Sequence, residues 1–552
     1  MMECKVLSSL VKVFPDRAPR SAVLRKASAL RGEKYSFQIA YRSPVGIQKM
    51  QFEITGKLAD CASVRRVGNV VAENLGHDIA AGKDGDGYLR HTLYPDVLYT
   101  DMENLHACPH VWYSVWVDVN IPKNCKSGVY DFQIQLHGDA EPDSETDPRP
   151  APLKFSLQVI DAVLPPQTLR HTEWFYCDCI AQEHNVKVWS PAFWKLLEKY
   201  FLTFSSHGIN LLLTPVFTPP LDTKVGGERM TTQLIDVRKT GTKYEFGFAK
   251  FDRWVRLAQK CGIEFFEISH LFTQWGAKFT PKIVADVNGK EKRIFGWDVA
   301  ADSRQYRAFL DAFLPLLKAR IEKLGLRDRV YFHISDEPVK DVIENYKTAS
   351  AILKKHLKGW RIMDAASHPE FYTDGLVQLP VPSESELDKF MELDISERWT
   401  YYCGGPALPY SNRIHAMPAS ANRIMGTLLY LYRCDGFLHW GFNFWNSGLS
   451  TRPMPPLANQ PDWDYISGDQ CLVYPGPEGP LDAMRSEVFF AGLQDMRALQ
   501  KLESLIGREK TVALIRKTAG MELRMNAFPL DEAFLPSLRE KVNAAIEKAS
   551  AK

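Results

Sequence analysis

The sequence lacks several features that would point to a partner directly. Its 552 residues carry a formal net charge of only +2 at pH 7, so no strong electric field indicates nucleic acid or an anionic membrane as a partner. No apolar run is long enough for a membrane span, and the N-terminal stretch MMECKVLSSLVKVFPDRAPR has no signal-peptide core. We therefore expect a cytoplasmic protein that binds neither nucleic acid nor membrane.

Motifs for bound cofactors are also scarce. The ten cysteines are scattered without metal-ligand spacing, and no acid–histidine set stands at ligand spacing along the chain. Reduced thiols and buried, hydrogen-bonded histidines are the simplest interpretation. The sequence therefore predicts neither a metal nor another cofactor.

The composition is that of a folded protein with more than one domain. Hydrophobic residues make up 45% of the chain and aromatic residues 12%, with 13 Trp and 21 Tyr. A chain of this length exceeds one ordinary domain, so two or three domains are expected. Trp and Tyr at this frequency are typical of sugar or apolar ligand sites, although large domains also bury Trp in their cores.

The first part of the chain predicts an antiparallel β-sandwich. Short stretches alternate apolar and polar residues and end in turns, as at 34–43, 110–122 and 128–138. A further strand candidate, LKFSLQVIDAVL at 153–164, closes the module and is followed by Pro165 and Pro166, so we place the domain at residues 1–165.

The pattern of predicted secondary structure changes at residue 166. Strand-like and helix-like segments alternate, which is typical of a parallel sheet covered by helices. The eight strand candidates span 169–176, 209–217, 263–272, 330–337, 359–366, 375–382, 398–405 and 435–445. Eight such units predict a (β/α)8 TIM barrel over residues 166–480, with a hairpin inserted at 231–248. Residues 481–552 predict a helical appendage that packs on the barrel.

Polar and aromatic residues collect where the predicted barrel strands end. The active site of such a barrel lies at the C-terminal ends of its strands, so these residues are candidates for one common site. The candidate substrate contacts are His270, Trp275, His333, Tyr401, Tyr402, Trp440, Asn443 and Trp445. Rings that stack on sugar faces and amides that bind hydroxyls make up the composition of a sugar pocket.

Two adjacent acids, Asp336 and Glu337, end the fourth strand candidate. Neighbours within a strand point to opposite faces, but a chain that turns after the strand can direct both acids to one ligand. Glycoside hydrolysis needs a protonated acid at the leaving oxygen and a negative group near the anomeric carbon. Repulsion could keep Glu337 protonated while Asp336 stays ionised. A surface turn followed by a helix N-cap is the alternative interpretation.

Longer motifs resemble one family. They are HISDEP, HGINLLLTPVFTPPLDT, ISHLFTQWGAKFTPKI, LHWGFNFWN and SGDQCLVYPGPEGPLDAMRSEVF, with LRGEKYSFQIAY and LYPDVL in the N-terminal module. Together they resemble glycoside hydrolase family 123, including its C-terminal domain of unknown function 4091, over nearly the whole chain. The resemblance implies an exo-acting, retaining β-N-acetylgalactosaminidase that uses the substrate's own acetamido group as the nucleophile. Its partner would be a glycan that contains N-acetylgalactosamine.

The resemblance also implies residue roles. Asp336 would orient the 2-acetamido nitrogen and stabilise an oxazolinium-like intermediate, and Glu337 would act as general acid and then as general base. Either Tyr401 or Tyr402 would hold the acetamido oxygen. An aromatic wall would come from Trp275, Trp440 or Trp445. Many relatives are exported, so a chain without a signal sequence is expected to act on short oligosaccharides already imported into the cell.

Several alternatives stay open. The enzyme could prefer N-acetylglucosamine, or it could be a conventional two-carboxylate glycosidase with Glu267 or Asp464 as the second acid. A carbohydrate-binding protein without catalysis is a third reading. His333 could orient the loop of the two acids instead of contacting substrate, and Asp222 could bind substrate hydroxyls or cap a turn.

Overall fold

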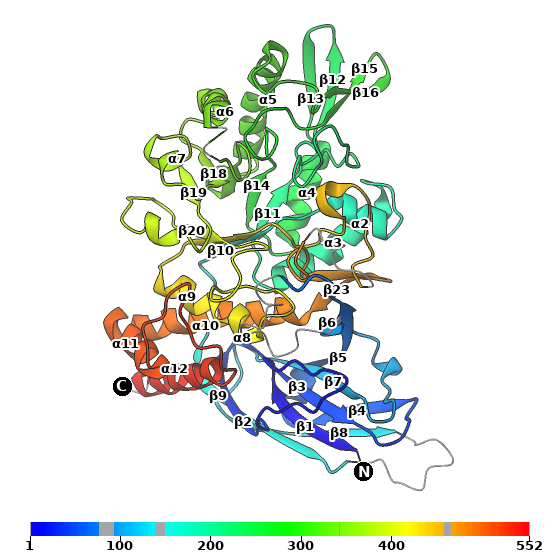
Figure 1. The fold of residues 1–552 in the computed structure, drawn as a ribbon, viewed down its shortest axis with the longest axis vertical. Coiled ribbons are helices and arrows are strands. Elements are labelled where there is room, and N and C mark those ends of the chain that lie inside the picture. Colours follow the sequence, from blue (N-terminus) through cyan, green and yellow to red (C-terminus); the bar gives the residue numbers. More distant parts are fainter. Residues whose placement is uncertain are drawn as a thin grey trace.

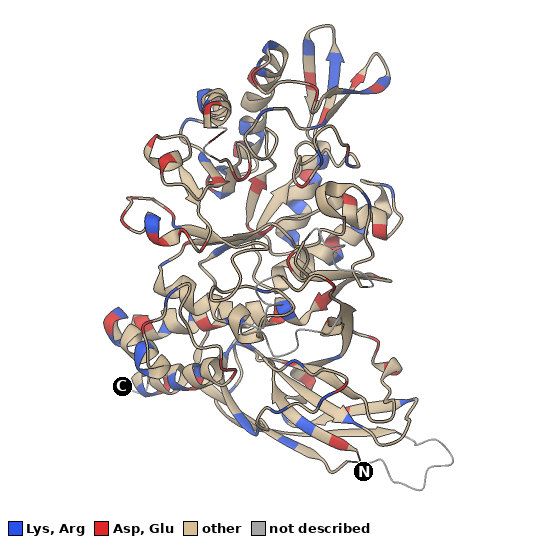
Figure 2. Ribbon diagram, viewed as in Figure 1, with Lys and Arg blue, Asp and Glu red and all other residues tan. Residues whose placement is uncertain are grey.

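The computed structural model describes residues 2–76, 93–138, 150–339, 341, 343–457 and 465–550. Figure 1 shows a β-sandwich at one end of the molecule, a strand–helix barrel towards the other end, and the C-terminal helices beside the junction of the two. Acidic and basic residues are interspersed over all three parts (Figure 2), in keeping with the small net charge. The predicted fold class is confirmed.

The sandwich consists of two sheets with one hydrophobic core between them. Their strands, in spatial order, are β1 (Glu3–Ser8), β3 (Lys34–Arg42), β7 (Trp112–Asn120), β5 (Ala62–Val71), β6 (Leu93–Tyr99), β23 (Gly479–Ala483) and β22 (Val473–Gly476) in one sheet, and β2 (Lys26–Arg31), β9 (Leu153–Val163), β8 (Gly128–Gly138) and β4 (Met50–Thr55) in the other. Pairing is antiparallel except between β2 and β9. Alternation decides which side chains enter the core, because every second residue of a strand shares a face; on β8 these are Phe132, Ile134 and Leu136.

The hairpin of β22 and β23 comes from the far end of the barrel sequence. It extends the first sandwich sheet, since Asp482 and Ala483 of β23 pair with Leu98 and Val97 of β6. The predicted boundary between residues 480 and 481 falls inside this hairpin. The division into 1–165, 166–480 and 481–552 therefore stays a prediction, while the elements within it are as described.

All eight predicted barrel strands form, in the predicted order. They are β10 (Arg170–Glu173), β11 (Leu211–Thr214), β14 (Phe265–Ile268), β17 (Val330–Phe332), β18 (Arg361–Ala365), β19 (Leu379–Val381), β20 (Trp399–Tyr401) and β21 (Gly436–His439). Every neighbouring pair is parallel, and β21 pairs with β10. Between β19 and β20 the ring is closed by a single bridge, in which the Tyr401 amide donates to the Pro382 carbonyl at 3.1 Å.

Helices cover the outside of this ring. They are α2 (Cys177–Glu183), α3 (Pro191–Ser206), α4 (Ala249–Lys260), α5 (Arg304–Lys323), α6 (Ile343–His356), α7 (Glu370–Thr373), α8 (Ala419–Arg423) and α9 (Met425–Leu431). Local signals set the ends of the two longest: Ser190 and Ser303 cap the N-termini of α3 and α5 with their hydroxyls. Gly325, with φ of +69°, follows the end of α5.

A small four-stranded sheet is inserted into the barrel. It contains the predicted hairpin, β12 (Asp236–Thr240) with β13 (Lys243–Gly247), and a second hairpin, β15 (Ile283–Val287) with β16 (Lys290–Phe295). The second hairpin was not predicted. Its signal is the dipeptide Asn288–Gly289, whose two positive φ angles are those of a type I′ hairpin turn.

The C-terminal helices join the two large parts of the molecule. They are α10 (Met484–Ile506), α11 (Arg508–Ala519) and α12 (Phe534–Ser550). α10 packs on α8 and α9 of the barrel, while α12 packs on β2 and β9 of the sandwich. Among the described residues, none of the helices combines the length and the apolar character needed to cross a membrane.

The contact between α9 and α10 depends on two glycines. A Cβ atom on Gly426 would lie 1.7 Å from the carbonyl oxygen of Gly492, and one on Gly492 would lie 2.4 Å from the carbonyl oxygen of Arg423. Both obstacles are backbone atoms, so the helices would have to separate. The close approach therefore requires glycine at both positions.

We expect Gly426→Ala to lower the free energy of unfolding by about 1–3 kcal/mol, because the added methyl group overpacks this contact. Thermal and urea unfolding would measure the loss. Ser504→Ala, on the exposed side of α10, is the matched control and should leave the melting temperature nearly unchanged. Equal stability of the two variants would contradict the proposed constraint.

Candidate active site

A cavity of about 280 Å³ opens at the C-terminal ends of the barrel strands. Residues that follow different strands line it, so the barrel brings together side chains far apart in the sequence. The lining consists of Trp174, Asp222, Trp275, Asp336, Glu337, Ala365, Tyr401, Cys403, Gly404, Leu438, Trp440, Tyr465, Ile466 and Asp469. Both predicted catalytic acids are among them.

The two adjacent acids reach one cavity because the chain turns after β17. The strand ends at Phe332, and Glu337 has a φ of +41°, in the left-handed region that residues other than glycine rarely adopt. Asp222 and Trp275, also in the lining, have φ of +44° and +56°. Each such residue costs about 1–3 kcal/mol and is held in place by its surroundings. Three residues of the cavity lining thus have a strained backbone.

Tyr401 is the tyrosine that faces the acids. Its hydroxyl donates a hydrogen bond of 2.6 Å to Oε1 of Glu337. Tyr402 is fully buried elsewhere, against the rings of Phe437 and His439. The sequence left the choice between Tyr401 and Tyr402 open, and only Tyr401 has access to the cavity.

The electrostatics of the pair differ from the sequence-based expectation. Burial, reinforced by the carboxylates of Glu337, Asp222 and Asp364, raises the pKa of Asp336 well above its usual range, and His333 opposes this rise. The sequence argument placed the retained proton on Glu337. Burial of Asp336, which is the more buried of the two residues, disfavours its ionised form, whereas the proton on Glu337 stays a prediction.

Two further acids line the cavity. Burial raises the pKa of Asp222 to about 6, with Arg229 and Tyr465 opposing and Glu337 adding to the rise. Burial also raises the pKa of Asp469 to about 7. Asp469 accepts hydrogen bonds from the indole of Trp440 at 2.9 Å and pairs with Nε2 of His439 at 3.1 Å. Sequence reasoning did not select Asp469, which follows no strand directly.

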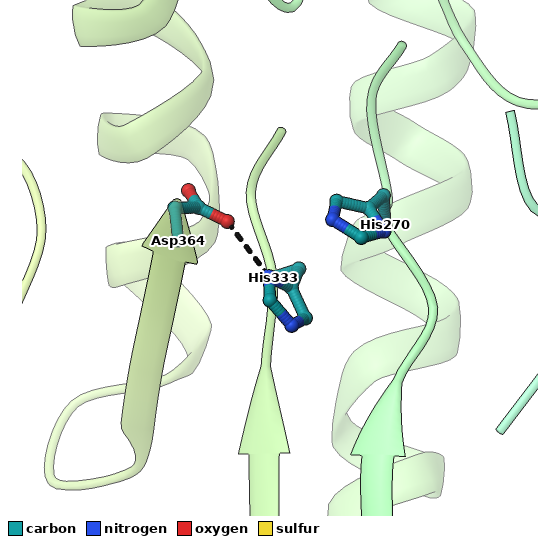
Figure 3. A group of neighbouring side chains, drawn as sticks. All are labelled: His270, His333 and Asp364. Atoms are coloured by element: carbon teal, nitrogen blue, oxygen red, sulfur yellow. Dashed lines mark hydrogen bonds and ion pairs between the residues drawn. The ribbon is translucent and has the colours of Figure 1, made fainter. Parts of the chain in front are cut away.

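Asp364 on β18 anchors the backbone that precedes Asp336 and Glu337. Its carboxylate accepts hydrogen bonds from the amides of Ile334 and Ser335 at 3.1–3.3 Å and from the hydroxyl of Tyr346 at 2.5 Å. It also pairs with Nδ1 of His333 at 3.0 Å (Figure 3). One buried side chain therefore fixes the three residues that precede Asp336.

His333 and His270 lie below the cavity and do not line it. Burial alone would lower the pKa of His333, but Glu267 and Asp364 raise it to about 10, so this imidazole is a buried cation. His270 stacks on it with ring centroids 4.2 Å apart. Burial and the charge of His333 hold the pKa of His270 well below its usual range. The placement of His333 agrees with its role in orienting the loop.

His270, His333 and Asp364 also form one of two groups among the described residues whose side chains lie close enough to hold a metal ion. His270, His333 and Asp364 offer ligand atoms within 4.8 Å of one another (Figure 3). However, both ring nitrogens of His333 already bond to carboxylates, Nδ1 to Asp364 and Nε2 to Glu267 at 2.5 Å. The group is therefore satisfied as an ion pair, apart from the two nitrogens of His270, which have no protein partner among the described residues.

The remaining predicted contacts divide into two groups. Trp275 and Trp440 line the cavity, and Trp275 is 43% exposed at its rim. Asn443 and Trp445 are buried outside it: the Asn443 amide bonds to the backbone of Tyr176, and the Trp445 indole bonds to the carbonyl of Val473. Trp174, which sequence reasoning did not select, takes a place in the aromatic wall.

The structure does not place either predicted second carboxylate, Glu267 or Asp464, in the cavity lining among the described residues. Glu267 lies inside the barrel, outside the cavity, where it accepts hydrogen bonds from Thr172, Trp174 and His333. Asp464 lies outside the described residues. Asp222 and Asp469 are thus the described carboxylates that share the cavity with the catalytic pair.

A parallel eight-stranded barrel with carboxylates and aromatic rings around a small cavity at the strand ends defines the class of barrel glycosidases. The family comparison agrees. Residues 174–502 match the model for the glycoside hydrolase 123 catalytic domain, and residues 12–138 match that for the glycoside hydrolase 123 N-terminal domain. The chain belongs to glycoside hydrolase family 123, as its motifs predicted.

Comparison with solved structures supports the fold. A family 123 glycoside hydrolase from Clostridium perfringens, studied for glycolipid glycan hydrolysis, superposes with a TM-score of 0.73 at 14% identity, over 99% of this chain and 97% of that one. EndoBT-3987 from Bacteroides thetaiotamicron (7% identity, 83% and 96% coverage) and a cyclomaltodextrinase (10%, 90% and 84%) reach TM-scores of only 0.22 and 0.30. No curated protein sequence matches the chain.

We expect Asp364→Asn to lower kcat by about 10- to 100-fold with a smaller change in KM, because the loop of Asp336 loses its anchor and catalytic geometry tolerates little displacement. Tyr346→Phe, which removes one of the hydrogen bonds to Asp364, is the matched control and should lose less activity. Steady-state kinetics with a chromogenic glycoside would measure both. An unchanged kcat in folded Asp364→Asn would contradict the role of the anchor.

The raised pKa of Asp336 also predicts an effect on stability. Between the ordinary carboxyl pKa and the raised one, the folded state binds the proton more tightly than the unfolded chain, so stability falls as pH rises through that window. Asp336→Asn removes this cost and should raise the melting temperature by about 1–3 °C at pH 8. At pH 3, below the ordinary carboxyl pKa, the difference should shrink, because Asp336 is then mostly neutral in both states. Calorimetry at the two pH values tests this; a variant less stable than wild type at pH 8 would refute it.

Proposed function

We propose that the protein is an exo-acting β-N-acetylhexosaminidase that releases terminal β-linked N-acetylgalactosamine with retention of configuration. The observation that carries the proposal is that Asp336 and Glu337 line the same small cavity beside Tyr401. A volume of about 280 Å³ is at or below the lower end of the range for ligand pockets, about 300–1,000 Å³. That size favours one sugar ring over a chain, which supports exo action.

The two acids take different roles in this reaction. The acetamido oxygen of the substrate attacks the anomeric carbon, and Glu337 protonates the departing oxygen, so the bond to the aglycone breaks as the oxazolinium-like ring forms. Asp336, once ionised, accepts the acetamido N–H and balances the positive charge of that ring. Glu337 then removes a proton from the incoming water, which opens the ring. Adjacent acids suit this chemistry because neither has to reach the opposite face of the sugar.

The hydroxyl of Tyr401 can donate a hydrogen bond to two different acceptors in this reaction. Its hydroxyl has one proton, so it donates either to Glu337, as in the unliganded site, or to the acetamido oxygen. We propose that substrate binding transfers this hydrogen bond to the acetamido group, which leaves Glu337 free to hold its own proton for the leaving group. Trp174, Trp275 and Trp440 would pack against the apolar faces of the sugar.

A conventional two-carboxylate glycosidase is the second candidate, because Asp222 and Asp469 share the cavity. An enzymic nucleophile would make the acetamido group dispensable for catalysis. Glycolipid glycans, on which the Clostridium enzyme was studied, are one source of the proposed terminal sugar. Neither point changes the leading proposal, which rests on the paired acids.

The proposal is tested with p-nitrophenyl β-N-acetylgalactosaminide and the matched glucosaminide. We expect a higher kcat/KM for the galactosaminide and strong competitive inhibition by galacto-thiazoline, which mimics the cyclised acetamido group. Glu337→Gln should lower kcat by at least about 100-fold while the inhibitor still binds.

Indifference to the thiazoline would point to the two-carboxylate mechanism. A wild-type protein that binds the sugar but is as inert as Glu337→Gln would identify a binding protein instead. A preference for the glucosaminide would keep the mechanism and change the substrate.

A further inference from the structure

The charges around the catalytic cavity are all of one sign. Among the described residues that line it there are four carboxylates, on Asp222, Asp336, Glu337 and Asp469, and no Lys, Arg or His. The other lining residues are aromatic, aliphatic or small, together with Cys403. The reaction proposed above uses Asp336 and Glu337, so it gives no function to Asp222 and Asp469.

The nearest arginines offer no charge to a ligand in the cavity. Arg229 donates to both carboxylate oxygens of Asp178 at 2.8 Å, and Arg413 donates to both oxygens of Glu173 at 2.8 Å. Both arginines are buried, so each forms a closed ion pair with its own acid. An anionic ligand would find neither guanidinium free to bind it.

The histidines near the cavity offer no free positive charge either: burial and the charge of His333 hold the pKa of His270 well below its usual range. The charge of His333 is shared between Glu267 and Asp364. Burial and the neighbouring Arg413 hold the pKa of His439 well below its usual range, so its ring is neutral. Among the residues that the structure describes, the unpaired charges that face the cavity are therefore its own carboxylates.

Asp222 and Asp469 have hydrogen-bonding capacity to spare. The hydroxyl of Tyr465 donates to Oδ1 of Asp222 at 3.3 Å, and Asp469 bonds to Trp440 and His439. A carboxylate has about four acceptor positions, so each can also accept hydrogen bonds from sugar hydroxyls. At pH 8, above the raised pKa values of about 6 for Asp222 and about 7 for Asp469, both carboxyls are ionised and the same oxygens repel a negative substituent at those hydroxyl positions.

We propose that Asp222 and Asp469 are specificity-determining residues that restrict the cavity to terminal sugars without an anionic substituent. N-acetylhexosamines whose ring hydroxyls are free fit the site, whereas rings that carry sulfate, phosphate or carboxylate are rejected. This inference rests on the proposed function and goes beyond it, since it defines which chemical forms of the sugar are accepted. It concerns the terminal ring alone and leaves the aglycone unrestricted.

The experiment is run at pH 8, where Asp222 and Asp469 are ionised. It compares p-nitrophenyl N-acetylgalactosaminide with its 4-sulfate and 6-sulfate, and with the 4-O-methyl and 6-O-methyl ethers as uncharged substituted controls. We expect kcat/KM for each sulfate to be at least about 100-fold below the unsubstituted sugar, and at least about 10-fold below the matched methyl ether, because only the sulfates meet the carboxylates as anions. Sulfates cleaved as fast as their methyl ethers would overturn the proposal.

Two variants test the named residues. Asp222→Asn and Asp469→Asn should both lower kcat/KM for the unsubstituted substrate, because their hydrogen bonds to it are weaker. In at least one of them, the ratio of kcat/KM for the methyl ether to kcat/KM for the sulfate should fall by about 10-fold. Asp374→Asn, an exposed acid outside the cavity lining, is the matched control and should keep the wild-type ratio. An unchanged ratio in both cavity variants would overturn the assignment of specificity to these acids.

Binding separates this inference from the proposed function. If no galactosaminide is hydrolysed, the proposed function fails, and calorimetric titration with free N-acetylgalactosamine and its 6-sulfate still tests the cavity. Tighter binding of the neutral sugar, lost in Asp469→Asn or Asp222→Asn, supports the inference by itself. Equal binding of the two sugars, or binding of neither, contradicts it.

Discussion

The buried carboxylate of Asp364 anchors the loop on which the rest of the site depends. The chain leaves β17 after Phe332 and reaches the catalytic acids within four residues, without regular hydrogen bonding of its own. Asp364 supplies the missing partners for His333, Ile334 and Ser335. Because these bonds lie in the barrel interior, where water does not compete, they hold the loop in a strained conformation that exposed bonds could not maintain.

Buried charges around Asp364 are paired with opposite charges, but this pairing does not extend to the residues that line the cavity. Below the wall, His333 lies between Glu267 and Asp364, and Arg413 pairs with Glu173. Burial raises the pKa of Asp222, Asp336 and Asp469 in the cavity, and the cations behind the wall, Arg229, His333 and Arg413, offset this rise only in part. The buried cations thus stabilise the structure around the cavity. The carboxyl groups in the cavity stay available to accept hydrogen bonds from a ligand.

Much of the fold was readable from local patterns. Alternating strands, parallel-type apolar runs and helix caps such as Ser190 each reflect a short-range preference, and all eight barrel strands were found where those patterns occur. Asp336 and Glu337 line the cavity for a related reason, since the site of a barrel lies where its strands end; their catalytic role stays a prediction. Two other features were less evident from the sequence. The hairpin of β22 and β23 pairs with β6, which lies more than 350 residues earlier in the chain. Asp469 directly follows no strand.

The sequence by itself determined the architecture, the family and the two neighbouring acids, because periodicity, capping residues and long motifs are properties of the chain alone. Only the tertiary structure decided that Tyr401 rather than Tyr402 faces Glu337, that Asn443 and Trp445 are buried outside the cavity, and that the raised pKa belongs to Asp336. Each of these depends on a loop's direction after its strand and on which charges burial brings near. Such distances arise between residues remote in sequence, so no local pattern encodes them.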